Sequence, residues 1–92
     1  MSMGDSLLII DISAEINKSL ELNTNATNLI DKINKLEDEE FIIDFKDVHF
    51  ISRTFAQAYY ASKKRSCKKI TEINLSDDVK PMMEMVEKQL MH

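Results

Sequence analysis

The sequence predicts one small α/β domain in which three helices pack on a mostly parallel or mixed sheet of three to four strands. Its ninety-two residues suit a single domain spanning residues 1–92. Short apolar runs alternate with segments that carry apolar residues at helical spacing, and the links between them are short. Strands and helices that alternate in this way are typically parallel and joined by right-handed crossovers.

Three short runs predict the strands. "LLIIDI" at residues 7–12 and "FIIDF" at residues 41–45 are apolar and rich in strand-forming residues. The second run is apolar on both faces, which predicts a strand covered on both sides. "ITEINL" at residues 70–75 alternates apolar and polar residues, which predicts a strand nearer an edge. Residues 13–23 fit either a hairpin extension or a loose turn, and the sequence leaves strand order open.

Two central helices follow from spacing and caps. Residues 23–37 repeat apolar side chains at helical intervals, with Asn23 or Thr24 as the expected N-cap. Ser52 is expected to cap a second helix that runs to about Ser66. Both helices are therefore predicted to begin at a residue whose side-chain oxygen satisfies a free backbone N–H.

The C-terminal segment predicts a third helix, capped by Ser76 or Asp77, with Pro81 in its first turn. Its apolar stripe comprises Val79, Met82, Met83, Val86 and Leu90. The stripe indicates a face buried in the core, or alternatively an adaptable methionine-bearing binding face.

Composition favours a cytoplasmic protein without a membrane role. The longest strictly apolar run, "LLII", is far shorter than a membrane span, and "MSMGDS" lacks the pattern of a signal peptide. Residues 1–5 are expected to be disordered or a cloning remnant. The single Cys67 cannot form an internal disulfide. The net charge of −4 argues against nucleic acid as the main partner.

Catalytic patterns are missing, so we predict no enzyme, no cofactor and no metal. Gly4 is the only glycine, whereas phosphate-binding loops need several. No pair of histidines or cysteines has zinc-ligand spacing. Asp11 and Asp44 fall near strand ends, where two carboxylates could hold a divalent cation if the strands were neighbours. An N-cap or a turn hydrogen bond is the alternative fate of each.

A basic segment spans residues 63–69. Its five cations are Lys63, Lys64, Arg65, Lys68 and Lys69. One interpretation is that cations complement the dipole at a helix C-terminus. The other is a docking patch for nucleic acid, a phosphate or an acidic partner.

The strand-to-helix corner "SRT", at residues 52–54, is the strongest candidate site. Loops at the carboxyl ends of parallel strands commonly carry functional groups in α/β proteins. A helix N-terminus also accommodates negative charge, so a phosphoryl group on Ser52 or Thr54 would be tolerated there. The alternative is plain capping by Ser52 with Thr54 facing solvent.

The stretch "FIIDFKDVHFISRTFAQAYY" resembles the signature of STAS domains, the fold of anti-sigma-factor antagonists, and more closely that of the STAS-like DUF4325 family. The similarity is specific over about 16 residues, including the matching positions between Asp44 and Ala56, and loose over residues 25–92. Thr54 falls where the STAS family carries its phosphorylated residue. Ser52 stands where that family has an aspartate, and Phe55 where it has a glycine.

This resemblance implies a non-enzymatic regulatory module that binds a protein partner. The implied partner is a GHKL-type ATPase of the anti-sigma kinase kind, with phosphorylation at the helix start changing the contact. The implied phosphoacceptor is Thr54, with Ser52 as the second candidate. The residues expected to contact the partner are Asp44, Arg53, Thr54 and Phe55. The oligomeric state is left open.

Overall fold

The computed structural model describes residues 7–16 and 19–90, so the expectation for residues 1–5 lies outside the described residues. The elements, in chain order, are β1 (Leu7–Asp11), α1 (Ile12–Glu15), β2 (Ser19–Leu20), α2 (Asn23–Lys35), β3 (Glu40–Asp44), β4 (Phe50–Ile51), α3 (Arg53–Arg65), β5 (Lys69–Ile73) and α4 (Lys80–Leu90).

The main sheet has three strands in the order β1-β3-β5, and both pairings are parallel. Its register aligns Ile10 with Ile43 and Glu72 on one face, and Ile9 with Ile42 and Thr71 on the other. The predicted α/β class, parallel sheet and three substantial helices are confirmed, with α2, α3 and α4 as the helices. Strand β5 lies at an edge, as its alternating pattern predicted.

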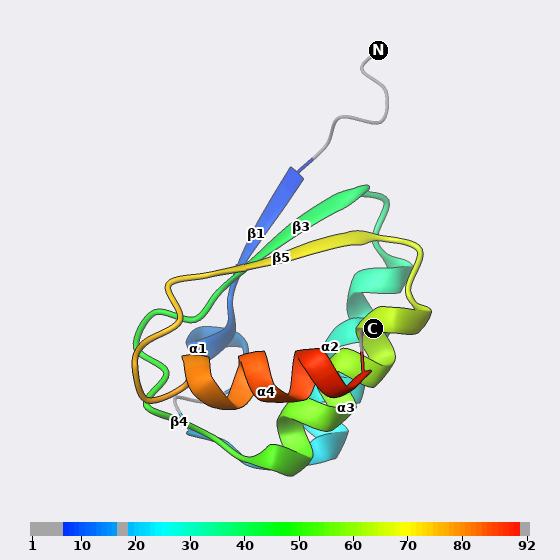
Figure 1. Cartoon of the computed structure of the whole chain (residues 1–92). Helices are drawn as coiled ribbons and strands as arrows, with labels where there is room; N and C mark the ends of the chain where they lie inside the picture. The colour runs from blue at the N-terminus through cyan, green and yellow to red at the C-terminus, as the bar shows by residue number, and fades with distance from the viewer. Residues whose placement is uncertain (1–6, 17–18, 91–92) are drawn as a thin grey trace.

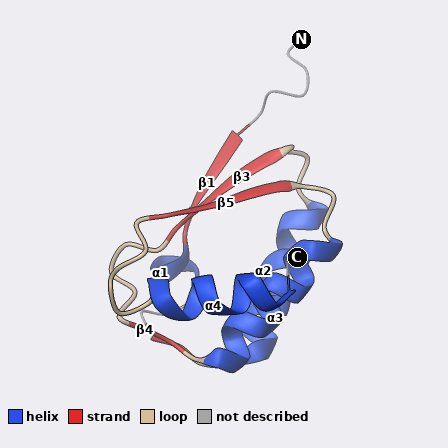
Figure 2. Ribbon diagram, in the orientation of Figure 1, coloured by secondary structure: helices blue, strands red, loops and turns tan. Residues whose placement is uncertain are grey.

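The helices form one layer beneath the sheet, so the molecule has two layers (Figures 1 and 2). The helix-facing side chains Phe41 and Ile43 are buried, whereas Ile42 on the opposite face is partly exposed. The prediction that this strand is covered on both sides is therefore wrong. Both crossovers join neighbouring strands in the same direction, and crossovers of one hand then carry α2 and α3 to the same face of the sheet, where Figure 1 shows them.

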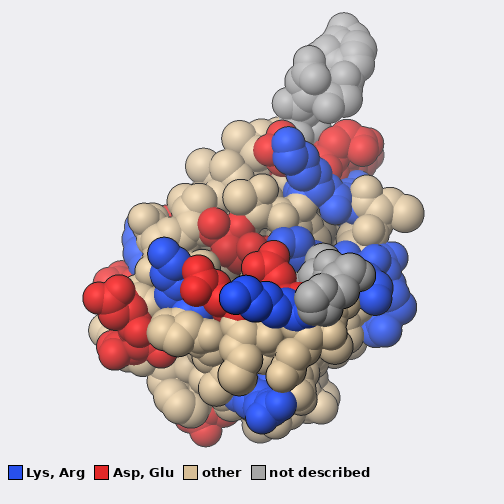
Figure 3. Space-filling view, viewed as in Figure 1, with Lys and Arg blue, Asp and Glu red and all other residues tan. Residues whose placement is uncertain are grey.

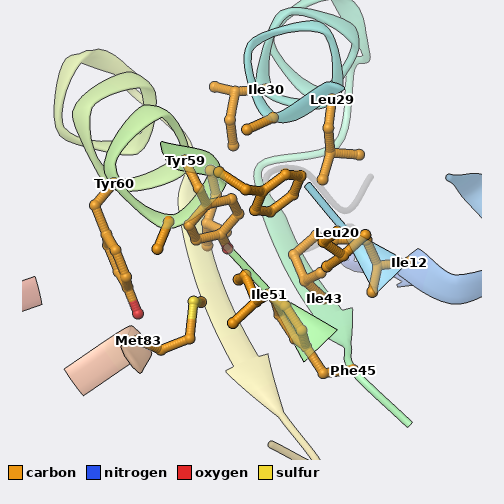
Figure 4. Close-up of a cluster of buried hydrophobic side chains, with 14 of the residues drawn as sticks. Ile12, Leu20, Leu29, Ile30, Ile43, Phe45, Ile51, Tyr59, Tyr60 and Met83 are labelled. Atoms are coloured by element: carbon orange, nitrogen blue, oxygen red, sulfur yellow. The ribbon is translucent and has the colours of Figure 1, made fainter. Parts of the chain in front are cut away.

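The core fills the space between the sheet and the helices. Figure 4 shows Ile43 and Phe45, from β3 and its end, beneath Tyr59 of α3 and Leu29 and Ile30 of α2. The α4 stripe joins this core: Val79, Met83 and Val86 are fully buried, and Met82 and Leu90 pack partly buried against it. The core interpretation of the methionine stripe is therefore confirmed.

The sequence left residues 13–23 open, and residues 17 and 18 lie outside the described residues. The described part contains a single helical turn, a very short strand and the first residue of α2. Asp11 caps α1, because its carboxylate accepts hydrogen bonds from the backbone N–H groups of Ser13 and Ala14. Strand β2 then pairs in parallel with β4, placing Leu20 beside Ile51. Both of these side chains are buried, so this second, two-stranded sheet is anchored in the core.

Two predicted caps differ from the structure. The N-cap of α2 is Leu22, without a side-chain cap, because pairing with β4 keeps the chain extended up to that residue. Asn23 and Thr24 therefore lie inside the helix. At the start of α4, the Ser76 carbonyl accepts from the Lys80 N–H at 2.8 Å, but its hydroxyl donates to the Val48 carbonyl at 3.5 Å instead of accepting from the helix.

Among residues 7–16 and 19–90, no helix is both long enough and apolar enough to cross a membrane.

Candidate functional site

Three hydrogen bonds made by the N–H and the hydroxyl of Ser52 fix the corner between β4 and α3. The backbone N–H of Ser52 donates to the Leu20 carbonyl at 2.8 Å, which continues the β2–β4 pairing. Its hydroxyl donates to the Glu21 carbonyl at 2.8 Å and accepts from the Phe55 N–H at 3.0 Å. The predicted N-cap is confirmed. The same hydroxyl therefore caps α3 and ties it to the segment that leads into α2.

Arg53 and Thr54 are exposed in the first turn of α3, as predicted for Thr54. Phe55 is different, because its ring is fully buried and stacks on Tyr59 with the ring centroids 6.4 Å apart. The expectation that Phe55 contacts a partner therefore does not fit its position in the core. A spacing of four residues puts Phe55 and Tyr59 on the same helix face, and that face packs against the sheet.

Two large apolar side chains near this corner face solvent. Phe50 of β4 is 49% exposed and Leu22, which precedes α2, is 61% exposed. Neither residue was singled out as exposed from the sequence. The exposure of Phe50 could have been predicted from strand geometry. Successive side chains in a strand point to opposite faces, so burial of Ile51 turns its neighbour Phe50 to the other face.

Asp44 lies at the end of β3, on the main sheet rather than at the corner. Its carboxylate accepts hydrogen bonds from the Lys46 N–H and the Asn74 side-chain amide, each at 2.9 Å. These contacts bind the loop after β3 to the end of β5. Within the described residues, no hydrogen bond joins Asp44 to the corner residues Ser52, Arg53 or Thr54, which follow β4 rather than the main sheet.

Asp11 and Asp44 are register partners on neighbouring strands, which fulfils the condition set for a two-carboxylate site. The Asp11 carboxylate, however, accepts from the Ser13 hydroxyl at 2.8 Å and lies 3.7 Å from the Lys46 ammonium. The Ser13 hydrogen bond is the largest influence lowering the pKa of Asp11. Cap and turn contacts thus occupy both carboxylates. In the part of the chain that is described, no three acidic, histidine or cysteine residues gather as metal ligands.

Two cations of the basic segment have structural partners. The Lys63 ammonium lies 2.7 Å from a Glu72 carboxylate oxygen and 5.5 Å from the centroid of the Tyr60 ring. The Lys68 ammonium donates to the carbonyls of Leu36 and Asp38, each at 2.8 Å. Lys68 thereby satisfies backbone acceptors where α2 ends.

The other three cations lie at the surface. Lys64 and Arg65 are exposed in the last turn of α3, and exposed Lys69 is 3.8 Å from Glu40. Figure 3 shows basic atoms on the right of the view, where α3 ends, with acidic atoms interspersed over the same face. The helix-dipole interpretation accounts for this arrangement without a ligand.

Sequence reasoning missed a largely buried polar cluster between α3 and β5. Glu72 lies on the helix-facing side of β5, where its carboxylate accepts from the Tyr59 hydroxyl and from Lys63, each at 2.7 Å. Burial is the main cause that raises the pKa of Tyr59 well above 10. The only signal was a glutamate at an inward position of an alternating strand.

An open hollow of about 290 Å³ lies between α1 and α2. It is lined by Glu15, Ile16, Asn25, Asn28, Leu29 and Lys32. Glu15 and Lys32 form an ion pair across it, which accounts for its charged groups.

Comparison with known proteins found no match: no protein-family model, no curated protein and no solved structure resembles this chain closely enough to be paired with it. Membership of the STAS-like family therefore stays a prediction that rests on the stretch from Asp44 to Ala56.

Proposed function

We propose that this chain is a non-enzymatic protein-interaction module whose contact surface is the corner at Ser52–Thr54, and that phosphorylation of Thr54 switches the contact. One observation carries the proposal: Arg53 and Thr54 are exposed on a helix start that three hydrogen bonds of Ser52 hold in place. A contact surface that is already rigid costs less conformational entropy when a partner binds.

Thr54 suits the role of phosphoacceptor better than Ser52 does. The Ser52 hydroxyl is engaged twice, as donor to Glu21 and acceptor from Phe55, and the residue is only partly exposed. A phosphoryl group on Ser52 would remove the donated bond and disturb the corner. Thr54 is exposed in the same turn, so the group can be added there without breaking these contacts.

Phosphorylation at Thr54 would change the surface charge by nearly two units. The first turn of a helix favours negative charge, because its free N–H groups form the positive end of the helix dipole. Phe55, the next residue, remains packed in the core. The switch therefore acts by electrostatic repulsion or attraction at the partner surface and requires no refolding.

The partner that the resemblance implies is a GHKL-type ATPase of the anti-sigma kinase kind. Arg53 offers a cation for an acidic group on such a partner. Exposed Phe50 and Leu22 lie on the segments that border the corner and supply apolar area that association can bury. A polar group beside exposed apolar side chains is the composition expected of an interface rather than of an active site.

The test is a calorimetric titration against a purified GHKL-type ATPase encoded beside this chain. Thr54→Glu should weaken binding at least about tenfold, equivalent to 1.4 kcal/mol. The matched control is Gln57→Glu, which adds the same charge to an exposed position of the same helix outside the corner and should bind as the wild type does. Thr54→Ala should also bind as the wild type does.

A second measurement locates the modification. Incubation with the ATPase and ATP, followed by mass spectrometry, should find phosphate on Thr54 and not on Ser52. Equal affinity for the wild type, Thr54→Glu and Gln57→Glu would refute the switch but leave the module. Undiminished binding by Arg53→Glu and Phe50→Ser would refute the corner as the contact surface.

A further inference from the structure

Strand β1 forms an open, apolar edge of the main sheet. Leu7, Leu8 and Ile9 are 47%, 37% and 59% exposed. Within residues 7–16 and 19–90, β1 pairs with β3 alone, so no strand lies along its other side. Figure 1 shows it at the margin of the sheet, above the helix layer. An edge of this kind is a template for pairing with another chain.

The opposite edge of the sheet is guarded. Strand β5 carries Lys69 at its start and Glu72 within it. An exposed lysine and an inward-pointing charged residue, here Lys69 and Glu72, are common protections of an edge strand against unwanted pairing. The only charged residue of β1 is Asp11, at its last position. Because β1 lacks these protections over its exposed apolar residues, it is the edge of the sheet that is more open to pairing with another strand.

We propose that two copies of this chain associate through β1, antiparallel about a two-fold axis at Leu8, so that their sheets join. In this register Leu8 meets Leu8 of the second copy, while Leu7 and Ile9 meet each other on the opposite face. Each exposed apolar residue of the strand thus gains an apolar partner. A two-fold interface requires such self-complementarity, and directly opposed antiparallel residues have Cβ atoms roughly 4.5–5.5 Å apart.

Charges on the open face disfavour the alternative of stacking two sheets face to face. Glu40 and Asp44 both point to this face at opposite ends of β3, the central strand, and exposed Lys69 lies beside Glu40 on the same face at 3.8 Å. A two-fold axis along the strands would oppose Glu40 to Glu40 and Asp44 to Asp44. An axis across the strands would oppose Glu40 to Asp44. Pairing through β1 leaves these carboxylates at separate places in solvent.

The test is sedimentation equilibrium of the full chain over a concentration series. Ile9→Lys places a charge on β1, and Thr71→Lys places the same charge on β5 in the same row of the same face. The wild type and Thr71→Lys should form a concentration-dependent dimer. Ile9→Lys should raise the dissociation constant at least about tenfold. Ile9 is already exposed, so thermal denaturation should show that both variants fold.

Cross-linking gives a second readout. In a Cys67→Ser background, Leu8→Cys should form a disulfide-linked dimer under mild oxidation, because antiparallel partners lie roughly within disulfide reach. Thr71→Cys should not. The proposal is overturned by a monomer at every concentration, by equal weakening in both lysine variants, by weakening in neither, or by a monomer that binds an unrelated extended apolar peptide instead of a second copy.

Discussion

The ion pair between Lys63 and Glu72 should stabilise the fold much more than other surface pairs do. Their charged atoms are 2.7 Å apart, and their side chains are only 15% and 11% exposed. Glu72 also accepts from the Tyr59 hydroxyl at 2.7 Å, so the cluster joins α3 to β5. Lys63→Met would leave a nearly buried carboxylate with one partner. We expect this to cost about 3 kcal/mol of unfolding free energy.

The worth of the pair itself is measured by a double-mutant cycle of Lys63→Met and Glu72→Gln, because glutamine keeps a partner for Tyr59. A charge-assisted hydrogen bond with little solvent around it should give a coupling energy of about 1.5–3 kcal/mol. The matched control is the pair of Lys69 and Glu40, which lies 3.8 Å apart with side chains 74% and 40% exposed. Its coupling should be below about 1 kcal/mol.

The assay is urea denaturation followed by circular dichroism, with the wild type and the six variants of the two cycles measured under one set of conditions. For a domain of this size, the single Lys63→Met change should also lower Tm by more than about 10 °C. Equal coupling energies in the two cycles would refute the reasoning, because burial would then have no influence on the strength of the pair.

Three further predictions follow from other contacts. Burial raises the pKa of Tyr60 above 10, so its contribution to stability is present at lower pH and should fall by about 1.4 kcal/mol per pH unit above 10. In Tyr60→Phe, the urea midpoint should fall less steeply with pH above 10 than it does in the wild type. The same pH dependence in both proteins would contradict the attribution of the fall to Tyr60. Lys68→Met should lose about 1–3 kcal/mol because two carbonyls lose their donor, whereas Lys64→Met should stay within about 0.5 kcal/mol. Equal losses in denaturation would count against the structural role of Lys68. The Ser13 hydroxyl lowers the pKa of Asp11, so stability from this group is present above pH 3.8 and lost as pH falls through the lowered value. In Ser13→Ala, the pKa from an NMR titration should rise, and an unmoved pKa would exclude that hydrogen bond as the cause.

The main elements could be predicted because their signals are local. The α3 helix could be predicted from its N-cap, Ser52, and from apolar residues at helical spacing. Both signals depend on residues that are close in the sequence. The cap of α2 was misplaced for the opposite reason. Leu22 precedes the helix because β2 pairs with β4, and the partners Leu20 and Ile51 are far apart in the sequence. Local propensity at Asn23 could not reveal that constraint.

At the candidate site, too, the features set by nearby residues could be predicted, whereas those set by distant packing could not. Thr54 and Ser52 could be assigned to a helix start from the sequence, and the structure adds how the Ser52 hydroxyl is shared. Phe55 was expected at the contact surface because it occupies the position of a family glycine. Its burial follows from the packing of Tyr59 one turn later, which only the assembled fold defines. The basic segment likewise looks like one patch in the sequence, but in the structure Lys63 and Lys68 have structural partners while the other three cations are exposed.

The division of roles between Ser52 and Thr54 explains how two residues in one turn can serve stability and recognition separately. Ser52 bonds backward to β2 and forward to the first turn of α3, so it holds two segments that are distant in sequence. Thr54 makes no such hydrogen bond within residues 7–16 and 19–90, and it is exposed to solvent. Ser52→Ala should therefore lower the unfolding free energy by about 1–2 kcal/mol, because a cap and its donated bond are lost. Thr54→Ala should change it by less than about 0.5 kcal/mol in the same urea denaturation. If both substitutions destabilised the chain equally, Thr54 would be part of the scaffold and could not change charge without disturbing the corner.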